Sequence, residues 1–306
     1  MVNLNIKIPE SYFKEEIMCG YHVTEEIKKL WAIELDLFNE FDRVCKKLEI
    51  PYFAIGGTLL GAARHKGFIP WDDDMDFAML WDDFNKFWEV APQEIKTPYY
   101  LQSFRTDINA DVSPTLKLRN SETSGATKWE YDNVKVSSHN KGIFVDIFPL
   151  FDVPEGQEQR DIQKKKIDQA WRAVRGWNAI QNIKAGYSTS YEQYISDYEI
   201  MSKGMSIEQI KQRYIDACSM VEGINEEVGL TACRTHFEKM IWKKEWFDGT
   251  VELPFEFTKI PCPKSYEKVL EKHYGDWKIP VCNSAMHEIY ILDTEIPYYR
   301  NPKLQF

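Results

Sequence analysis

The stretch that decides the fold runs from Pro51 to Leu80 and reads PYFAIGGTLLGAARHKGFIPWDDDMDFAML. Its apolar run from Tyr52 to Ile55 predicts a short strand. A Gly-Gly-Thr turn follows, and we expect one or two helical turns from Leu59. The segment from Asp72 onward predicts a second strand, whose side chains alternate between its two faces. This order of elements is typical of a site that binds phosphate and metal.

The second predicted strand carries a run of acids. Asp72, Asp74 and Asp76 fall on one of its faces, and Asp73 points away. Three like charges on one face repel unless a cation lies among them or water surrounds them. The run alone is also typical of a solvated acidic loop or a calcium site. The free backbone N–H groups expected at residues 56–58 favour metal-assisted catalysis, because a phosphate bound through magnesium needs such donors near the carboxylates.

A third acid lies in the segment KGIFVDIFPLFDVP, residues 141–154. Residues 143–148 are apolar except for Asp146, which predicts a buried strand. A lone carboxylate in a buried strand is costly unless it is paired, protonated or bound to metal. On residues alone, Asp146 is either the partner of a core arginine or part of the acidic site.

Basic residues occur in two places. The strand predicted over residues 113–119 puts Lys117 and Arg119 on one face, either to meet a phosphate or as a solvated strand edge. Arg64 and His65 belong to a second basic cluster beside the glycine turn, where an arginine can hold a phosphate with two hydrogen bonds.

The composition sets limits on function. The 306 residues are 43% hydrophobic and 28% charged, and the net charge of −10 is opposite to the basic surface that nucleic-acid binding needs. Six cysteines are widely spread without zinc-site spacing, so we expect mostly free thiols. The first residues lack signal-peptide features and no apolar run is long enough to span a bilayer, which predicts a cytoplasmic protein.

Helical and strand periodicity continues outside these segments. We expect helices over residues 24–48, 82–90, 155–184, 206–228 and 264–274, and a half-buried edge strand over 251–257. The helices over 155–184 and 206–228 belong to a mainly helical C-terminal extension in this interpretation.

Three segments resemble the signature of the LicD family. They are GGTLLGAARHKGFIPWDDDMD (56–76), GIFVDIFPL (142–150) and YGDWKIP (274–280), the last followed by His287. LicD proteins are phosphocholine transferases that decorate bacterial cell-surface polysaccharides. The family is similar to the nucleotidyltransferase-fold superfamily, in which a glycine turn and a two-acid strand are joined by a third acid on a later strand.

The resemblance implies a fold, domain boundaries and a set of site residues. The fold is α+β, with a nucleotidyltransferase-like mixed sheet flanked by helices. Residues 1–306 form one catalytic unit, with a core at 24–152 and an extension at 153–306 that ends in an edge strand and the YGD motif. The predicted catalytic and metal-binding residues are Asp74, Asp76 and Asp146. The predicted substrate-binding residues are Gly56, Gly57, Thr58, Arg64, His65, Lys117, Arg119 and His287.

The implied reaction is a metal-dependent phosphotransfer. With Mg²⁺ or Mn²⁺, phosphocholine passes from CDP-choline to a hydroxyl of a teichoic acid, lipopolysaccharide or capsule precursor, and CMP leaves. A lipid-linked glycan acceptor implies peripheral contact with the inner membrane face. Aromatic faces bind quaternary ammonium groups, and Trp71, Trp129 and Tyr131 are candidates.

Two alternatives remain: transfer of a nucleotidyl group from a nucleoside triphosphate to a small alcohol or sugar, and a catalytically silent glycan- or nucleotide-binding protein. The sequence leaves open the head group, the acceptor, the number of metal ions, the roles of Asp72 and Asp73, and whether Asp146 acts as base or metal ligand.

Overall fold

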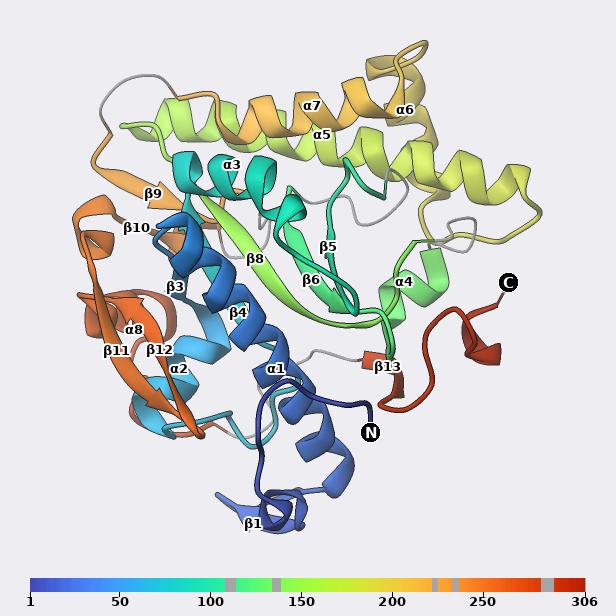
Figure 1. Ribbon diagram of the computed structural model, residues 1–306. Coiled ribbons are helices and arrows are strands. Elements are labelled where there is room, and N and C mark those ends of the chain that lie inside the picture. Colours follow the sequence, from blue (N-terminus) through green and yellow to red (C-terminus); the bar gives the residue numbers. More distant parts are fainter. Residues whose placement is uncertain (108–113, 134–138, 222–224, 233–236, 282–288, 306) are drawn as a thin grey trace.

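The protein is described by a computed structural model that covers residues 1–107, 114–133, 139–221, 225–232, 237–281 and 289–305 (Figure 1). It has the predicted α+β architecture, built on a seven-stranded mixed sheet. Five strands follow the order β10 (Ile241–Lys243), β9 (Glu227–Gly229), β8 (Ile143–Asp152), β4 (Asp76–Leu80) and β3 (Phe53–Ala54). β6 (Leu116–Asn120) pairs with β8 and with β5 (Tyr99–Gln102).

Two helices, each within one residue of its predicted bounds, cover one face of this sheet. α1 (Glu25–Leu48) begins after Thr24, whose hydroxyl caps it by accepting the backbone N–H of Ile27 at 3.3 Å. α3 (Trp81–Val90) packs beside it against β4 and β8. The ring of Phe77 on β4 lies 5.3 Å from that of Phe38 on α1, so the odd-numbered positions of β4 face the helices.

Strand alternation places the polar residues on the opposite face. In β8, Val145 and Ile147 belong to the hydrophobic core beneath α1, so Asp146 between them points the other way. In β6, Leu116 and Leu118 are likewise core residues. The prediction that Lys117 and Arg119 share a face is therefore confirmed.

The glycine segment differs from its predicted conformation. α2 spans Gly56–Arg64, so the Gly-Gly-Thr residues are its first turn and not a separate turn before a helix. Gly56 has φ +57°, a left-handed conformation that side chains rarely adopt. The chain thus passes directly from the two-residue strand β3 into a helix, which brings the helix N-terminus against the start of β4.

The acid run also differs from its prediction. β4 begins only at Asp76, and residues 72–74 form the loop before it. A backbone hydrogen bond from Asp72 to Ile69 turns this loop, and the indole N–H of Trp31 donates to the Asp72 carbonyl at 2.9 Å. Strand alternation does not apply to a loop held in this way, so the predicted sorting of Asp72 to Asp74 between two faces is wrong.

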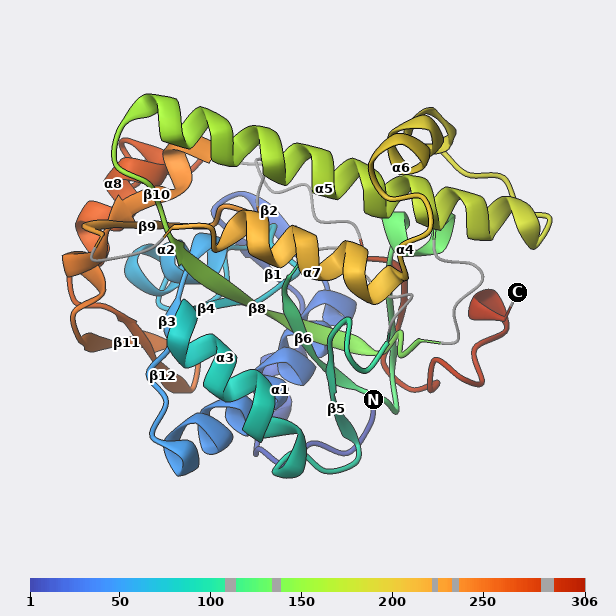
Figure 2. The ribbon, with the colours of Figure 1, turned by 90° about the horizontal axis from the view of Figure 1, so that it is seen from above.

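Long helices come after the core segment in the sequence. α5 (Gln157–Lys184) runs along the top of the molecule in Figure 1 and packs against α6 (Ile195–Met201) and α7 (Ile207–Cys218) (Figure 2). The helix predicted over 206–228 ends at Cys218, because residues 227–229 instead pair with β8 as strand β9. The part after residue 152 therefore also completes the central sheet, while the predicted division at 152 stays a prediction.

The C-terminal part returns to the core. β11 (Thr250–Phe255) and β12 (Thr258–Pro263) form a hairpin, and α8 (Tyr266–Tyr274) follows it. β13 (Ile289–Asp293) pairs with β7 (Ser124–Thr127), which leads into α4 (Lys128–Asn133). Near the N-terminus, β1 (Glu16–Met18) pairs with β2 (Tyr21–Val23). Short 3-10 helices lie at Glu10–Phe13, Ala91–Gln93, Glu192–Tyr194, Phe237–Met240, Lys244–Phe247 and Pro302–Leu304.

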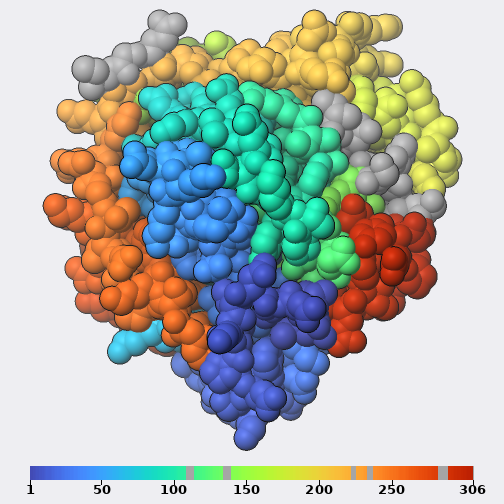
Figure 3. Space-filling model, in the orientation of Figure 1, coloured from blue at the N-terminus to red at the C-terminus, as the bar shows by residue number. Residues whose placement is uncertain are grey.

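The N-terminal segment lies next to the residues that follow β13. The Val2 N–H donates to the Thr294 carbonyl at 2.9 Å, and Figure 3 shows the blue N-terminal surface beside the red C-terminal one. Among the helices that the structure describes, none is both long and apolar enough to cross a membrane.

Candidate active site

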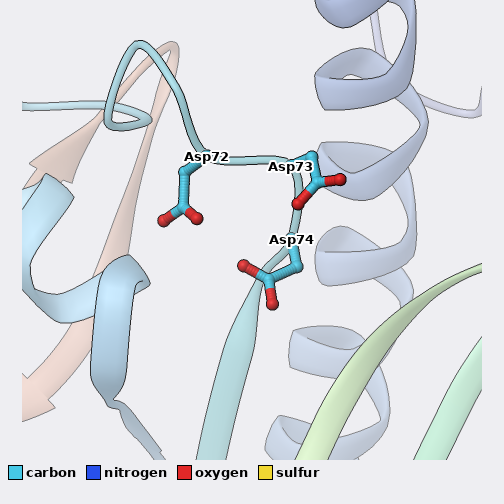
Figure 4. Close-up of side chains that lie close together, drawn as sticks. All are labelled: Asp72, Asp73 and Asp74. Atoms are coloured by element: carbon cyan, nitrogen blue, oxygen red, sulfur yellow. The ribbon is translucent and has the colours of Figure 1, made fainter. Parts of the chain in front are cut away.

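Three consecutive acids form a compact cluster in the loop before β4 (Figure 4). One carboxylate oxygen each from Asp72, Asp73 and Asp74 lies within 4.8 Å of the other two. Asp73, expected to point away, is thus part of the cluster, and it also accepts the backbone N–H of Ile289 at 3.3 Å. The loop brings together the acids that a continuous strand would have separated.

A second polar row crosses the sheet beside this cluster. Asp76 on β4 is the register partner of Asp146 on β8, and Asp146 is the register partner of Lys117 on β6. The Lys117 ammonium lies 2.8 Å from Asp146 Oδ1 and 3.1 Å from Oδ2. Asp146 therefore pairs with a lysine of the adjacent strand and not with a core arginine.

The glycines of α2 make room for two of the acids. A Cβ at Gly57 would lie 2.2 Å from Oδ2 of Asp72, and a Cβ at Gly56 would lie 2.9 Å from Oδ2 of Asp76. The first N–H groups of a helix have no partner within it, and α2 has no side-chain cap. The two carboxylates thus lie against a helix end that attracts anions.

Thr58 fixes the start of the acid-bearing strand. Its hydroxyl accepts the backbone N–H of Asp76 at 2.7 Å, and its side chain is buried. The hydroxyl predicted to contact substrate instead connects α2 to β4, so that the helix N-terminus and the acids are held in one geometry.

The crowding of acids changes their protonation. Burial, the charges of Asp74 and Asp73, and a hydrogen bond with the Asp74 carboxyl raise the pKa of Asp72 to about 8. Burial and the charges of Asp74 and Asp146 raise the pKa of Asp76 well above its ordinary value, and Lys117 opposes this shift. The site retains protons near neutral pH because it holds more negative charge than its surroundings compensate.

The donor atoms fit a hard divalent cation. The cluster offers carboxylate oxygens alone, and oxygen ligands are what Mg²⁺, Mn²⁺ and Ca²⁺ prefer. A cation would neutralise the repulsion that raises these pKa values. Asp72, Asp73 and Asp74 would hold it, together with the neighbouring Asp76, and the predicted metal-binding role of Asp146 stays a prediction.

One acid of this region was missed by the sequence analysis. Glu34 on α1 is fully buried, and its strongest electrostatic neighbours are Asp74 and Asp73, followed by the other two aspartates. The periodicity of α1 indicated only a packing face. The available signal was a glutamate three residues after Trp31, on the side of the helix that faces the core.

Arg119 does not have the predicted phosphate-binding role. It is 0% exposed, and its guanidinium pairs with Glu130 and donates to Gln102 Oε1 at 2.7 Å and to the Gly142 carbonyl at 2.8 Å. These partners lie inside the fold. Alternation placed Arg119 correctly on the face of Lys117, but helix α4 covers that part of the face with Glu130.

The second basic cluster is also largely structural. Arg64 donates through Nη1 to the carbonyls of Trp277 at 2.9 Å and Ile279 at 3.3 Å. Burial and the charge of Arg64 lower the pKa of His65 to about 4, so His65 is neutral at pH 7. The prediction of two phosphate-binding cations here is corrected: Arg64 connects α2 to the segment after α8, and His65 carries no charge.

The YGD segment reaches the acid site through its tyrosine. Burial of the phenol group and the charges of Asp76, Asp72 and Asp74 raise the pKa of Tyr274, although 40% of the residue as a whole is exposed. Its ring stacks on His273 with ring centres 4.1 Å apart. Tyr274 at the end of α8 is thus within electrostatic range of the acids. His287, the other predicted residue near the C-terminus, lies outside the described residues.

The three aromatic candidates for an ammonium group are scattered. The Trp129 ring is covered by the guanidinium of Arg175, at 4.0 Å from its centre. Tyr131 packs on Tyr290 with ring centres 4.9 Å apart. Trp71, next to the acid loop, contacts His65 edge to face, with ring centres 6.3 Å apart. Of the three, Trp71 adjoins the acids in sequence.

The geometry of the site is that of one class of protein. A glycine pair that opens a helix, acids at the start of the next strand and a third acid on the adjacent parallel strand are the parts of a nucleotidyltransferase-type domain. Residues 49–174 match the family model described as LicD/FKTN/FKRP, nucleotidyltransferase domain. That range includes the glycines, the acid loop, Lys117 and Asp146.

Similarity to known proteins extends over most of the chain. It is 26% identical over 253 residues to the lipopolysaccharide cholinephosphotransferase LicD of Haemophilus influenzae, covering 80% of this chain and 89% of that protein. A shorter match, 40% identical over 73 residues, is to the uncharacterized protein RT0683 of Rickettsia typhi, covering 24% of this chain and 23% of that protein. Residues 49–174 thus match the LicD-type domain, and the chain is similar to a LicD protein over 80% of its length.

Proposed function

We propose that the protein transfers phosphocholine from CDP-choline to a hydroxyl of a cell-surface glycan, with release of CMP, and that the reaction needs Mg²⁺ or Mn²⁺. The observation that carries the proposal is the acid loop 72–74 beside Asp76 and Asp146, at the N-terminus of α2. Oxygen ligands for a cation and backbone donors for a phosphate lie together there.

The acceptor is proposed from chemistry and similarity. The Haemophilus relative is named for lipopolysaccharide, and teichoic acid or capsule precursors offer the same kind of sugar hydroxyl. We place the reaction in the cytoplasm, with a lipid-linked precursor presented at the inner face of the membrane.

The roles of the residues follow from their positions. A bound divalent cation would neutralise diphosphate charge and orient the leaving group. The N–H groups at the start of α2 bind phosphate oxygens beside the carboxylates of Asp72 and Asp76, for which Gly57 and Gly56 leave room. The acceptor oxygen forms a bond to phosphorus as the bond from phosphorus to the CMP oxygen breaks.

Asp146 is the residue that takes the proton from the acceptor hydroxyl. Its carboxylate is held by Lys117 at 2.8 Å and lies beside Asp76, on the sheet face opposite α1. The same lysine orients the carboxylate. This assignment makes Asp146 a general base.

Thermal melts test donor and metal dependence without an acceptor. We would compare CDP-choline, CDP-ethanolamine, CTP and ATP, each with and without Mg²⁺, for the wild type, Asp74→Asn and the control Glu89→Ala, which changes an exposed acid on α3. A ligand at 100 times its dissociation constant stabilises the protein by about 2.7 kcal/mol, which moves the midpoint by several degrees.

The expected result is a shift with CDP-choline that needs Mg²⁺, is lost in Asp74→Asn and is kept in Glu89→Ala. A shift with CTP or ATP alone would instead indicate nucleotidyl transfer. No shift with any nucleotide would contradict the proposal and favour a silent scaffold. Release of CMP upon addition of a glycan acceptor then completes the test.

A further inference from the structure

Glu34 lies on the side of α1 that borders the acid loop. Trp31, one helical turn earlier, donates its indole N–H to the carbonyl of Asp72 at 2.9 Å. Residues three apart share a helix face, so Glu34 is directed toward the same loop. Figure 4 shows α1 passing directly beside Asp73 and Asp74.

The surroundings of Glu34 do not satisfy its charge. The side chain is 0% exposed, and neither of its oxygens has a hydrogen-bond partner among the described residues. Its strongest electrostatic neighbours are four aspartates, residues 72, 73, 74 and 76. A buried carboxyl group without a partner costs several kcal/mol, so a structural role alone does not explain it.

Asp36, on the same helix, shows what a structural buried carboxylate looks like here. It is 1% exposed, and it accepts the backbone N–H groups of Asn5 at 2.6 Å and Ile6 at 3.1 Å. It also accepts the hydroxyl of Tyr99 at 2.7 Å. The fold thus satisfies Asp36 completely and leaves Glu34 directed at the aspartates.

We propose that Glu34 is a further metal-binding residue, which supplies a carboxylate to the divalent cation of the acid site. The aspartates come from one short loop and approach a cation from one side, whereas Glu34 approaches from α1. A cation among them satisfies the buried carboxylate and the loop together. This inference rests on the metal site of the proposed function.

The test measures the binding of Mn²⁺ alone to the metal-free protein, by calorimetry or by the electron paramagnetic resonance signal of free Mn²⁺. Glu34→Gln keeps the size of the side chain and removes its charge, and Asp36→Asn is the matched control on the same helix. We expect Glu34→Gln to weaken Mn²⁺ binding about 10-fold or more, and Asp36→Asn to change it less than 2-fold, or about 0.4 kcal/mol. Glu34→Asp keeps the charge and should retain part of the affinity.

Thermal melts of the metal-free variants separate binding from folding. We expect Glu34→Gln to melt no lower than the wild type without metal, because the buried carboxyl group has no hydrogen-bond partner to lose, and to gain less from added Mn²⁺. Asp36→Asn should melt lower and gain as much as the wild type. Unchanged Mn²⁺ affinity in both Glu34 variants would overturn the inference.

The outcomes also separate this inference from the proposed function. Wild type that binds no Mn²⁺ contradicts both the metal site and the role of Glu34. If Mn²⁺ binding depends on Glu34 but CDP-choline releases no CMP, the role of Glu34 is supported and CDP-choline is rejected as the donor. If CMP is released and Glu34→Gln keeps full Mn²⁺ affinity, the role of Glu34 is rejected and the proposed function stands.

Discussion

Asp76 and Asp146 lie side by side on neighbouring parallel strands, as register partners of β4 and β8. Neighbouring strands are about 4.8 Å apart, so two acids far apart in sequence line one site. Asp76 adjoins the acid loop and Asp146 adjoins Lys117. The two acids therefore suit different tasks in the proposed reaction. Asp76 is placed to bind the metal, and Asp146 is placed to take the proton.

Replacing these two acids should separate the tasks. We expect Asp146→Asn to lower kcat for CMP release by about 10²-fold to 10⁴-fold, the usual contribution of a general base, and to keep Mn²⁺ affinity within about 3-fold of wild type. Asp76→Asn should weaken Mn²⁺ binding as well as turnover. Kinetics and Mn²⁺ titration on the same preparations check this. If Asp146→Asn loses metal affinity as Asp76→Asn does, Asp146 is a metal ligand instead.

The ion pair between Lys117 and Asp146 should matter for stability. Their side chains are only 10% and 14% exposed, so Lys117→Met leaves the mostly buried carboxylate of Asp146 without its partner. We expect a loss of about 3 kcal/mol in the free energy of unfolding, measured by urea denaturation.

Lys244→Met is the control for this loss. Lys244 pairs with Asp152 at the same 2.8 Å, but its side chain is 42% exposed, so its loss should cost less than about 1 kcal/mol. The double variant Lys117→Met/Asp146→Asn should recover much of the loss. Equal losses for the two lysines would show that burial does not decide the strength of the pair.

A methyl group at Gly57 should disturb the metal site. A Cβ there would lie 2.2 Å from Oδ2 of Asp72, so Gly57→Ala must displace that carboxylate. We expect Mn²⁺ affinity to fall about 10-fold or more, with the helix retained. In the same helix, Gly61→Ala meets the backbone carbonyl of Gly67 at 2.4 Å and should lower the melting temperature instead. Mn²⁺ affinity of Gly57→Ala equal to wild type would show that the Asp72 carboxylate is not needed for the metal.

The raised pKa of Asp72 predicts a pH dependence of stability. Its pKa is about 8 in the folded protein against 3.8 for the ordinary group, so the folded state retains a proton that the unfolded state releases. The metal-free protein should therefore lose stability as pH rises from about 4 to 8, by at most about 1.4 kcal/mol per pH unit for one proton. Above pH 8 this contribution is constant.

Chemical denaturation at several pH values, with a chelator present, measures this effect. Asp72→Asn should show a shallower decline over the same range, and saturating Mn²⁺ should reduce the difference between the two proteins. Parallel pH profiles for the wild type and Asp72→Asn would contradict the assignment of the proton to Asp72.

The sequence by itself determined the local elements and the faces on which side chains lie. Periodicity located α1 and α3, and alternation put Lys117 and Arg119 on one face of β6. These features depend on residues that are near one another in the chain, because backbone geometry alone sets periods of 3.6 and 2. The clustering of acids and the third carboxylate, Asp146, were likewise visible in the sequence.

Only the tertiary structure decided which residues pack against each face of these helices and strands. Arg119 was expected at a phosphate and is buried against Glu130. Glu34, which no sequence pattern singled out, lies against the aspartates. Tyr274 comes within electrostatic range of the acids because α8 returns to the core. The burial and charge of a side chain depend on segments that are distant in sequence, and no local period carries that information. Local pattern therefore determined the elements of this protein, and long-range packing decided which side chains form its site.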